Sequence, residues 1–181
     1  MLDKFNRRSI RLHGYDYSQE GLYFVTLCVQ NRLRLFGEIV DSEMLLNQAG
    51  EYAQTCWLEI PKHFSNVNLH EFVIMPNHIH GIIEIVGAKN FLPSNVNTPR
   101  DYPQNKAKDI SPLHGTSKTI GSIVRGFKIG VTKWCRHHTD IYNVWQRNYY
   151  EHIIRDFNDY GRIVDYIQDN PSNWPQDDLF F

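Results

Sequence analysis

The strongest local feature of this chain is Met75-Pro76-Asn77-His78-Ile79-His80-Gly81-Ile82-Ile83. Pro76 fixes its own φ and Asn77 tolerates turn geometry, so we predict a turn at residues 75–77. Apolar and β-branched residues lie on both sides of this turn, which predicts strands over residues 69–75 and 79–86. A turn this short predicts that the two strands pair antiparallel.

Two histidines stand at the start of the second strand. Residues i and i+2 of a strand point to the same face, so His78 and His80 should project together while Ile79 points the other way into the core. Two imidazoles this close can form part of a metal site. The alternative is a pair of half-buried histidines that only pack at the start of a strand.

A metal site needs further ligands, and a helix predicted over residues 156–170 offers them. Tyr166 and Asn170 lie one turn apart on the same helix face. The amide oxygen of Asn170 can bind an ion that the histidines hold, and the Tyr166 phenol would then lie beside that ion. Without the histidines, a tyrosine at the edge of the core and an asparagine at a helix end would be the simpler interpretation.

The other segments show strand and helix patterns in turn. Three further strands are predicted, at residues 21–29, 33–40 and 142–146, with the second as hairpin partner of the first. Helical spacing of apolar residues predicts helices at 42–59, with Ser42 as N-cap and Pro61 after its end, and at 120–134. Together the elements predict an α+β fold, an antiparallel β-sheet with packed helices in the ferredoxin or RRM style.

The chain has 181 residues, enough for one domain with its own core and no disulfides. We expect residues 1–181 to form a single domain, with a flexible insertion loop at about residues 87–114, where Gly, Pro, Asn and Ser are frequent. No apolar run is long enough for a membrane span, and three scattered cysteines fit a reducing compartment. A cytoplasmic protein without a membrane partner is therefore expected.

The 19 basic and 20 acidic residues nearly balance, but they are segregated along the chain. Residues 115–138 contain five Lys and Arg and no acid. Such patches can follow a phosphate backbone, and the aromatic, basic and polar mixture at 145–155 suits single-stranded nucleic acid. The alternative is a solvated helix face. The candidate DNA-binding residues are Arg7, Arg8, Lys118, Arg125, Lys128, Lys133 and Arg147.

Three motifs, MPNHIHGII at 75–83, WQRNYYEHIIRD at 145–156 and YIQDNP at 166–171, resemble the single-tyrosine HUH transposases. The similarity is greatest to the branch called REP-associated tyrosine transposases, relatives of the insertion sequence 200/605 type. The N-terminal RRSIRLHGYDYSQEGLYFVTLCVQNR also resembles that branch. The resemblance covers roughly residues 7–86 and 115–174, and the motifs occur in the order of the family.

The resemblance implies a site as well as a fold. His78 and His80 correspond to the metal ligands of the HUH motif, and Tyr166 corresponds to the nucleophile. Asn170 stands where many relatives have Gln, which keeps the amide oxygen on a shorter side chain. The implied cofactor is a divalent metal, Mg²⁺ or Mn²⁺. Tyr149 and Tyr150 are rival nucleophiles without an amide four residues later, and the role of His152 stays open.

The implied activity is that of a transposase or nuclease in the bacterial cytoplasm or nucleoid. Such enzymes bind single-stranded DNA with hairpin elements, and they cleave and rejoin it through a 5′-phosphotyrosine intermediate. Relatives are often dimers, so a homodimer is a further expectation.

Two other classes of protein fit parts of the pattern. A non-catalytic single-stranded DNA- or RNA-binding module could keep the same fold. A cupin-type metal enzyme would use His78, His80 and Glu84 as an H-x-H-x3-E set, but the later histidine strand of that fold has no counterpart here. A structural zinc site lacks cysteines at suitable spacing.

Overall fold

The computed structural model describes residues 19–86, 119–177 and 179–180. Their centre is a four-stranded sheet in the order β4-β5-β1-β6, and every neighbouring pair is antiparallel. The strands are β1 (Gly21–Cys28), β4 (Val67–Met75), β5 (His78–Ile85) and β6 (Tyr150–Ile154). The predicted insertion loop at about 87–114, and the candidate residues Arg7, Arg8 and Lys118, lie outside the described residues.

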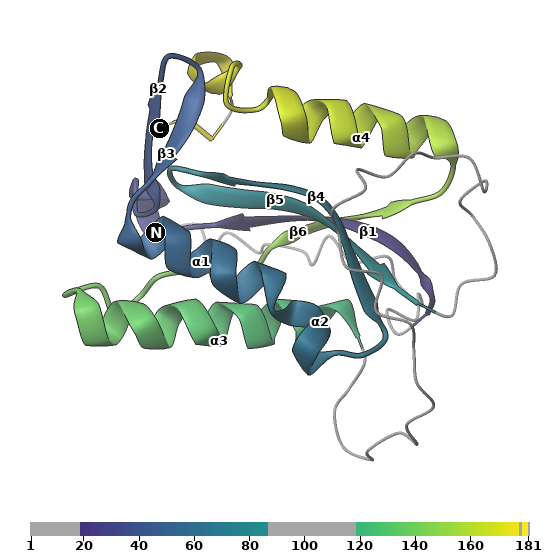
Figure 1. Ribbon diagram of the computed structural model, residues 1–181, viewed down its shortest axis with the longest axis horizontal. Coiled ribbons are helices and arrows are strands. Elements are labelled where there is room, and N and C mark those ends of the chain that lie inside the picture. The colour runs from purple at the N-terminus through teal and green to yellow at the C-terminus, as the bar shows by residue number, and fades with distance from the viewer. Residues whose placement is uncertain (1–18, 87–118, 178, 181) are drawn as a thin grey trace, which may run out of the picture.

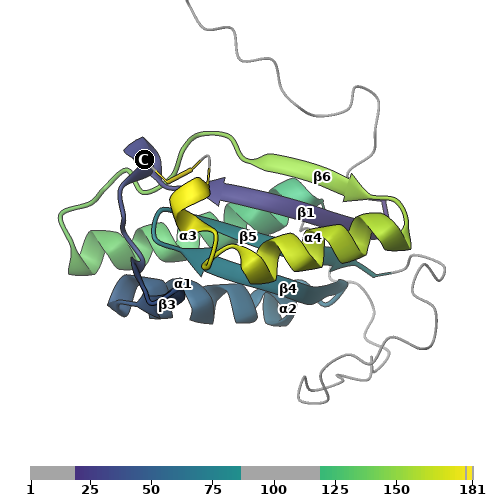
Figure 2. The ribbon, with the colours of Figure 1, turned by 90° about the horizontal axis from the view of Figure 1, so that it is seen from above.

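Helices cover both faces of this sheet (Figure 1). One face packs against α1 (Gln48–Leu58), α2 (Ile60–His63) and α3 (Ile120–His138), and the other against α4 (Phe157–Asp169). Seen from above in Figure 2, α4 lies over the part of the sheet that contains β4, β5 and β1. The predicted α+β class, an antiparallel sheet with packed helices, is confirmed.

The alternation of side chains along the strands divides the interior into two apolar clusters. Tyr23, Val25 and Ile79 belong to the larger cluster, which α1 and α3 complete. Phe24 and Ile82, an odd number of residues away in their strands, belong to a smaller cluster under α4. Because the period of a strand is two, each strand supplies both faces of the sheet.

A glycine allows α1 to approach the sheet closely. The indole of Trp57 packs directly over Gly81, and a Cβ atom at position 81 would overlap the indole ring. Trp57 is fully buried against Phe72 and Phe127. Gly81 therefore serves the packing of the helical layer on the face opposite to His78 and His80.

The prediction for residues 33–59 was wrong in two respects. Residues 33–40 do not pair with β1; instead β2 (Gly37–Val40) pairs with β3 (Glu43–Leu46) in a separate hairpin. Asp41 and Ser42 have φ values of 49° and 66°, as a two-residue hairpin turn requires. The helix therefore begins only at Gln48, where the Asn47 side chain accepts a hydrogen bond from the Gly50 amide at 3.0 Å.

The prediction of a strand at 142–146 was also wrong. Only Trp145 forms a single bridge, to Val29, and the fourth strand of the sheet is β6. The polar run from Gln146 to Asn148 lies between Trp145 and β6. The backbone carbonyl groups of Gln146 and Asn148 accept hydrogen bonds from Lys128 Nζ at 3.0 and 3.3 Å. Lys128 of α3 thus bonds backbone carbonyl groups that a neighbouring strand would bond in a sheet.

The other element predictions agree with the structure. The turn at 75–77 joins an antiparallel pair, and α3 and α4 cover the predicted ranges. Thr119 and Asp156 cap these two helices by accepting hydrogen bonds from the amides of Ser122 and Asp159. Among the described helices, none combines the length and the apolar character that crossing a membrane requires.

Candidate metal and tyrosine site

His78 and His80 lie at the start of β5, on the face that α4 covers. Both side chains are buried, and their ring centroids are 4.4 Å apart. Ile79 points to the opposite cluster, as the strand period requires. The prediction that the two histidines share one face is therefore confirmed, although the burial is more complete than the sequence pattern indicated.

The hydrogen bonds of Asn77 decide which nitrogen of His78 carries a proton. The Asn77 amide nitrogen donates to the carbonyl oxygens of Leu179, at 2.6 Å, and of Arg32, at 3.4 Å. Its Oδ1 therefore faces His78 Nδ1, 2.8 Å away, and must accept a hydrogen bond from it. The proton of the neutral ring is therefore on Nδ1 and the free lone pair is on Nε2. In this tautomer a histidine can bind a metal ion through Nε2.

His80 is held in a similar way. Its Nδ1 lies 2.9 Å from Thr26 Oγ1 on the neighbouring strand β1, and its ring stacks on Phe24. Its Nε2 points toward α4, where the hydroxyl oxygen of Tyr166 lies 3.2 Å away. The two histidines thus direct their Nε2 atoms away from the strand, that of His80 toward Tyr166 on α4 and that of His78 toward Asp177 in the segment after it.

Burial keeps both rings neutral near pH 7. It lowers the pKa of His78 to about 4, against the opposing effect of the Asp177 carboxylate and the Asn170 amide. It also holds the pKa of His80 well below the ordinary 6.5, and a charge on His78 would lower that pKa further. Neutral imidazoles are the form that binds cations.

Three buried polar atoms around this point have no hydrogen-bond partner within the described residues: His78 Nε2, Asn170 Oδ1 and Asp177 Oδ2. Unpaired buried polar groups are costly, so atoms that converge in this way indicate a missing partner. His78, His80 and Asp177 each offer a ligand atom within 4.8 Å of the others. Two imidazoles, a carboxylate and a nearby amide oxygen form a donor set that fits a divalent cation.

Asp177 was not among the candidates from the sequence. It follows the short helix η2 (Trp174–Gln176) near the end of the chain, where no periodicity or spacing relates it to the histidines. The segment folds back onto the site because Leu179 accepts the hydrogen bond from Asn77 and donates its own amide to Asp177 Oδ1 at 2.6 Å. The Trp174 ring also packs near His78, at 5.9 Å between centroids.

Tyr166 lies at the solvent side of this donor set. Its side chain is 46% exposed, so a phosphate group has access to the hydroxyl that contacts His80. Of the rival tyrosines, Tyr149 packs with the α3 cluster on the other face of the sheet. Tyr150 lies on β6 with its ring 6.2 Å from Phe24, the residue that stacks on His80. The structure therefore brings Tyr166, and neither rival, into contact with the histidines.

Comparisons with known proteins bear on this fold. No protein-family model matches the sequence. A Haemophilus influenzae protein of uncharacterized function is 51% identical over 185 residues, which span 99% of each chain. A second Haemophilus influenzae protein, whose name assigns it to the REP-associated tyrosine transposases, is 27% identical over 157 residues, or 86% of this chain and 73% of that one.

A solved structure of a REP-associated tyrosine transposase bound to a REP hairpin is similar with a TM-score of 0.57. The similarity covers 91% of this chain and 74% of that chain, at 21% sequence identity. This chain has the fold of a REP-associated tyrosine transposase. The resemblance that the motifs indicated is thereby confirmed for the architecture that holds His78, His80 and Tyr166.

Two polar networks attach α4 to the sheet of this transposase fold. His70 on β4 lies with Nδ1 3.1 Å from the Tyr160 hydroxyl and with Nε2 3.2 Å from Glu84 Oε2 on β5. The hydrogen bond between His70 and Glu84 lowers the pKa of Glu84. His152 on β6 lies 2.7 Å from Asp159 in the first turn of α4. His152 is therefore placed to hold α4 against the sheet, away from the donor set.

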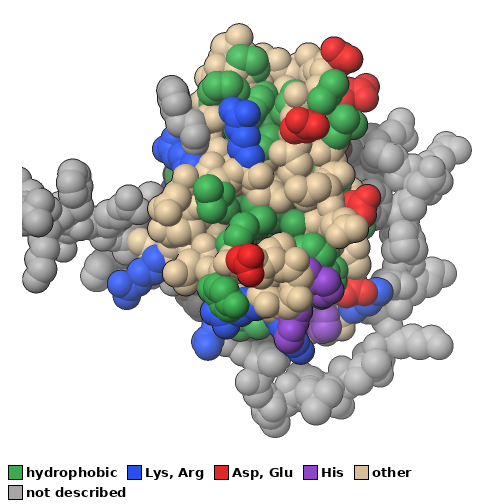
Figure 3. Space-filling view, turned by 90° about the vertical axis from the view of Figure 1, so that its left-hand side faces the viewer, with side chains coloured by type: hydrophobic (Ala, Val, Ile, Leu, Met, Phe, Trp, Pro, Cys, Tyr) green, Lys and Arg blue, Asp and Glu red, His purple; other side chains and the backbone are tan. Residues whose placement is uncertain are grey.

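The described basic candidates gather on the face of the sheet opposite to His78, His80 and Tyr166. Arg125, Lys128 and Lys133 of α3, with Arg147, line a groove of about 740 Å³ that also includes Arg136 and Tyr149. Figure 3 views the molecule from the end at which α3 terminates, and blue and purple basic side chains gather along its lower edge. The structure thus joins residues of two separate sequence segments in one basic groove.

Within this basic groove, Lys128 differs from its neighbours. Its ammonium group donates to the carbonyl oxygens of Gln146 and Asn148 and lies 5.8 Å from the ring centroids of Trp145 and Tyr149. Burial lowers the pKa of Lys128 to about 8. Lys128 thus supports the segment that follows α3, whereas Arg125 and Lys133 are exposed.

Proposed function

We propose that this protein is a transposase or nuclease that binds single-stranded DNA hairpins and cleaves and rejoins DNA through Tyr166. The observation that carries the proposal is the contact between the exposed Tyr166 hydroxyl and His80 at the edge of a buried donor set. The similarity of fold to a hairpin-bound transposase supports it. Its DNA substrate places this activity in the bacterial cytoplasm.

The chemistry follows from the charge of the substrate. A phosphodiester is an anion and repels nucleophiles, and a phenol with an ordinary pKa of about 10 is a weak one at neutral pH. A divalent cation, Mg²⁺ or Mn²⁺, held by His78, His80, Asp177 and Asn170, would offset the phosphate charge and polarise the phosphorus centre. The buried rings of the histidines are already neutral and oriented for that ligation.

Tyr166 performs the bond exchange in this proposal. Its phenol oxygen loses its proton and forms a bond to phosphorus, and the bond from phosphorus to the 3′ oxygen breaks. That oxygen takes up a proton and leaves as a free 3′-hydroxyl, while the phosphate stays on the DNA 5′ end as a phosphotyrosine. Attack by a different 3′-hydroxyl reverses the step and joins two strands without ATP.

Substitution of Tyr166 by Phe tests the proposal. Phe keeps the ring packing near Phe24, so the fold and hairpin binding should survive while the covalent protein–DNA adduct disappears. The assay follows a labelled single-stranded hairpin that migrates with the protein on a denaturing gel, with added Mn²⁺ or Mg²⁺, and maps the modified peptide by mass. Tyr150→Phe, equally exposed, is the matched control and should keep the adduct.

Two results would contradict this assignment. An adduct that maps to Tyr149 or Tyr150 would show that a different tyrosine attacks. Tight hairpin binding without any adduct from the unchanged protein, under either ion, would favour a non-catalytic binding module with the same fold.

A further inference from the structure

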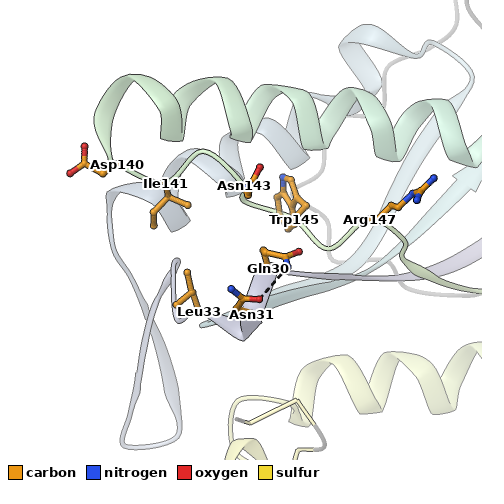
Figure 4. A pocket seen from close by; sticks show the side chains of 8 residues that line it. All are labelled: Gln30, Asn31, Leu33, Asp140, Ile141, Asn143, Trp145 and Arg147. Carbon is orange, nitrogen blue, oxygen red and sulfur yellow. Dashed lines mark hydrogen bonds between the residues drawn. The ribbon is translucent and has the colours of Figure 1, made fainter. Parts of the chain in front are cut away.

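A second cavity lies beside the end of β1 and belongs neither to the donor set nor to the basic groove on α3. It has a volume of about 550 Å³. Figure 4 shows it between the short helix η1 (Gln30–Arg32) and the segment that follows α3. Its lining combines carboxamides, apolar side chains, one guanidinium and one carboxylate, contributed by Gln30, Asn31, Leu33, Asp140, Ile141, Asn143, Trp145 and Arg147.

This cavity is connected directly to the loop that carries His78. The Val29 amide donates to the Asn77 carbonyl oxygen at 2.8 Å, immediately before the cavity residues 30 and 31. Cys28, the last residue of β1, pairs with His78 in the sheet. Asn77 contacts both the Arg32 carbonyl oxygen and His78, so the cavity wall and the histidine share one neighbour.

The polar groups in the cavity suit recognition of a flat heterocycle with donors and acceptors on its edge. Gln30 Nε2 donates to Asn31 Oδ1 at 3.1 Å, and within the described residues Gln30 Oε1 and Asn31 Nδ2 make no other hydrogen bond. In the part of the chain that the structure describes, the Asn143 amide makes no hydrogen bond. Carboxamides pair a donor with an acceptor and can read base edges in a bidentate way.

The rest of the lining distinguishes a base from a phosphate. Leu33, Ile141 and the indole of Trp145 offer apolar surface for the faces of a ring. Asp140 offsets the single positive charge of Arg147, so the cavity has no excess of positive charge for an anion. Arg147 also lines the basic groove on α3, so one side chain borders both the cavity and the surface where a phosphate backbone would run.

The backbone at the cavity wall has an uncommon conformation. Asn31 and Arg32 have φ values of 56° and 53°, in the left-handed region that residues other than glycine rarely adopt. Two such residues in succession turn the Asn31 amide toward Gln30 and direct the Arg32 carbonyl oxygen to Asn77. The same distortion therefore shapes the cavity and supports the site loop.

We propose that this cavity binds one unpaired nucleobase of the DNA strand close to the phosphate that Tyr166 attacks, and that Gln30, Asn31 and Asn143 select its identity. The position of this base along the DNA strand rests on the proposed function, because that function defines the phosphate that Tyr166 attacks. It adds a means by which the protein chooses where to cleave, in addition to contacts with the phosphate backbone.

The test measures equilibrium binding in a Tyr166→Phe background, so that it requires no cleavage. Hairpin oligonucleotides with unpaired flanks are varied one base at a time, and affinity is measured by fluorescence anisotropy at fixed salt. At one unpaired position, the preferred base should bind about tenfold more tightly than the other three, as one bidentate base contact gives.

Two variants identify the cavity as the source of that preference. Asn31→Gly retains a residue that tolerates positive φ but removes the amide. Asn143→Ala removes a side chain that makes no hydrogen bond to any residue the structure describes. The double variant should bind all four bases with the affinity of the weaker ones, and Asn143→Ala alone should lose part of the preference. Gln54→Ala, an exposed amide on α1, is the control and should change nothing.

Failure of this proposal differs from failure of the proposed function. Equal affinity for all bases at every unpaired position, or an undiminished preference in the double variant, would overturn the base-binding cavity and leave the catalytic proposal intact. A preference that disappears in the double variant, together with no covalent adduct from the unchanged protein that retains Tyr166, would support the cavity and overturn the catalysis. Absence of any hairpin binding would overturn both.

Discussion

The hydroxyl oxygen of Tyr166 lies 3.2 Å from Nε2 of His80, although the two residues are 86 positions apart in the chain. The lone pair on that nitrogen is the one that His80 would offer to a cation. Tyr166 and a bound cation therefore compete for the same atom, and the contact links the attacking group to the state of the metal site.

This competition predicts that Tyr166→Phe binds Mn²⁺ more tightly than the unchanged protein. A cation no longer has to displace a hydrogen bond whose net value is about 1 kcal/mol, which corresponds to an affinity gain of about fivefold. Isothermal titration calorimetry of the DNA-free protein measures the effect. Tyr150→Phe should leave the affinity unchanged, and equal affinities in all three proteins would mean that His80 does not bind the cation through Nε2.

Asp177 is predicted to bind the cation, although it lies outside the sequence motifs. Asp177→Asn keeps Oδ1 for the Leu179 amide but removes the charge beside His78, so Mn²⁺ affinity should fall by at least about tenfold. The melting temperature in the presence of a chelator should stay near that of the unchanged protein. Asp169→Asn, at the exposed end of α4, is the matched control; an equal loss in that variant would indicate a general electrostatic effect.

Acid should destabilise the cation-free protein because two buried histidines are neutral in the fold. Between their ordinary pKa of 6.5 and the folded value for His78 of about 4, the unfolded chain binds protons that the folded chain does not. The free energy of unfolding should therefore fall as pH decreases through this window, by about 1.4 kcal/mol per pH unit for each such histidine.

Urea denaturation at several pH values, with a chelator present, measures that dependence. His78→Gln and His80→Gln should each make it shallower, whereas His63→Gln on the exposed end of α2 should not. A free energy of unfolding that is constant between pH 6.5 and 4 in the unchanged protein would contradict the burial of neutral rings.

The contact of His70 with Tyr160 is predicted to hold α4, and with it Tyr166, against the sheet. Tyr160→Phe removes one hydrogen bond from a partly buried network, so the free energy of unfolding should fall by about 1 kcal/mol. Adduct formation should also slow while hairpin affinity stays unchanged, because only the position of the nucleophile is affected. A change in hairpin affinity with an unchanged rate would contradict this role.

The basic groove on α3 predicts different outcomes for two of its lysines. Lys133 is exposed, so Lys133→Ala should reduce the slope of log affinity for a single strand against log salt concentration by about 0.7. Lys128 is occupied by two carbonyl oxygens, so Lys128→Ala should lower the melting temperature instead. Lys62→Ala, at the exposed end of α2, is the control; equal slopes in the Lys133 and Lys62 variants would make the groove a solvated face.

Much of this architecture follows from local sequence patterns. The turn at 75–77, the shared face of His78 and His80, and the helices α3 and α4 depend on side-chain periods and caps that act over a few residues. The errors at 33–46 and 142–146 have a common cause. Short strands depend on their partners, and neither the Asp41-Ser42 hairpin nor the hydrogen bonds from Lys128 to carbonyl groups leaves a periodic signal.

Local periods were enough to predict that the two histidines face one way and that Tyr166 and Asn170 share a helix face. The meeting of β5, α4 and the segment after η2 is visible only in the folded chain. It adds Asp177 to the donor set and, within the described residues, leaves His78 Nε2, Asn170 Oδ1 and Asp177 Oδ2 buried without a hydrogen bond. The physical reason is that a strand or helix period fixes directions within one element. The distance between elements depends instead on how the apolar clusters pack, and on single long-range contacts such as the hydrogen bond from Asn77 to Leu179.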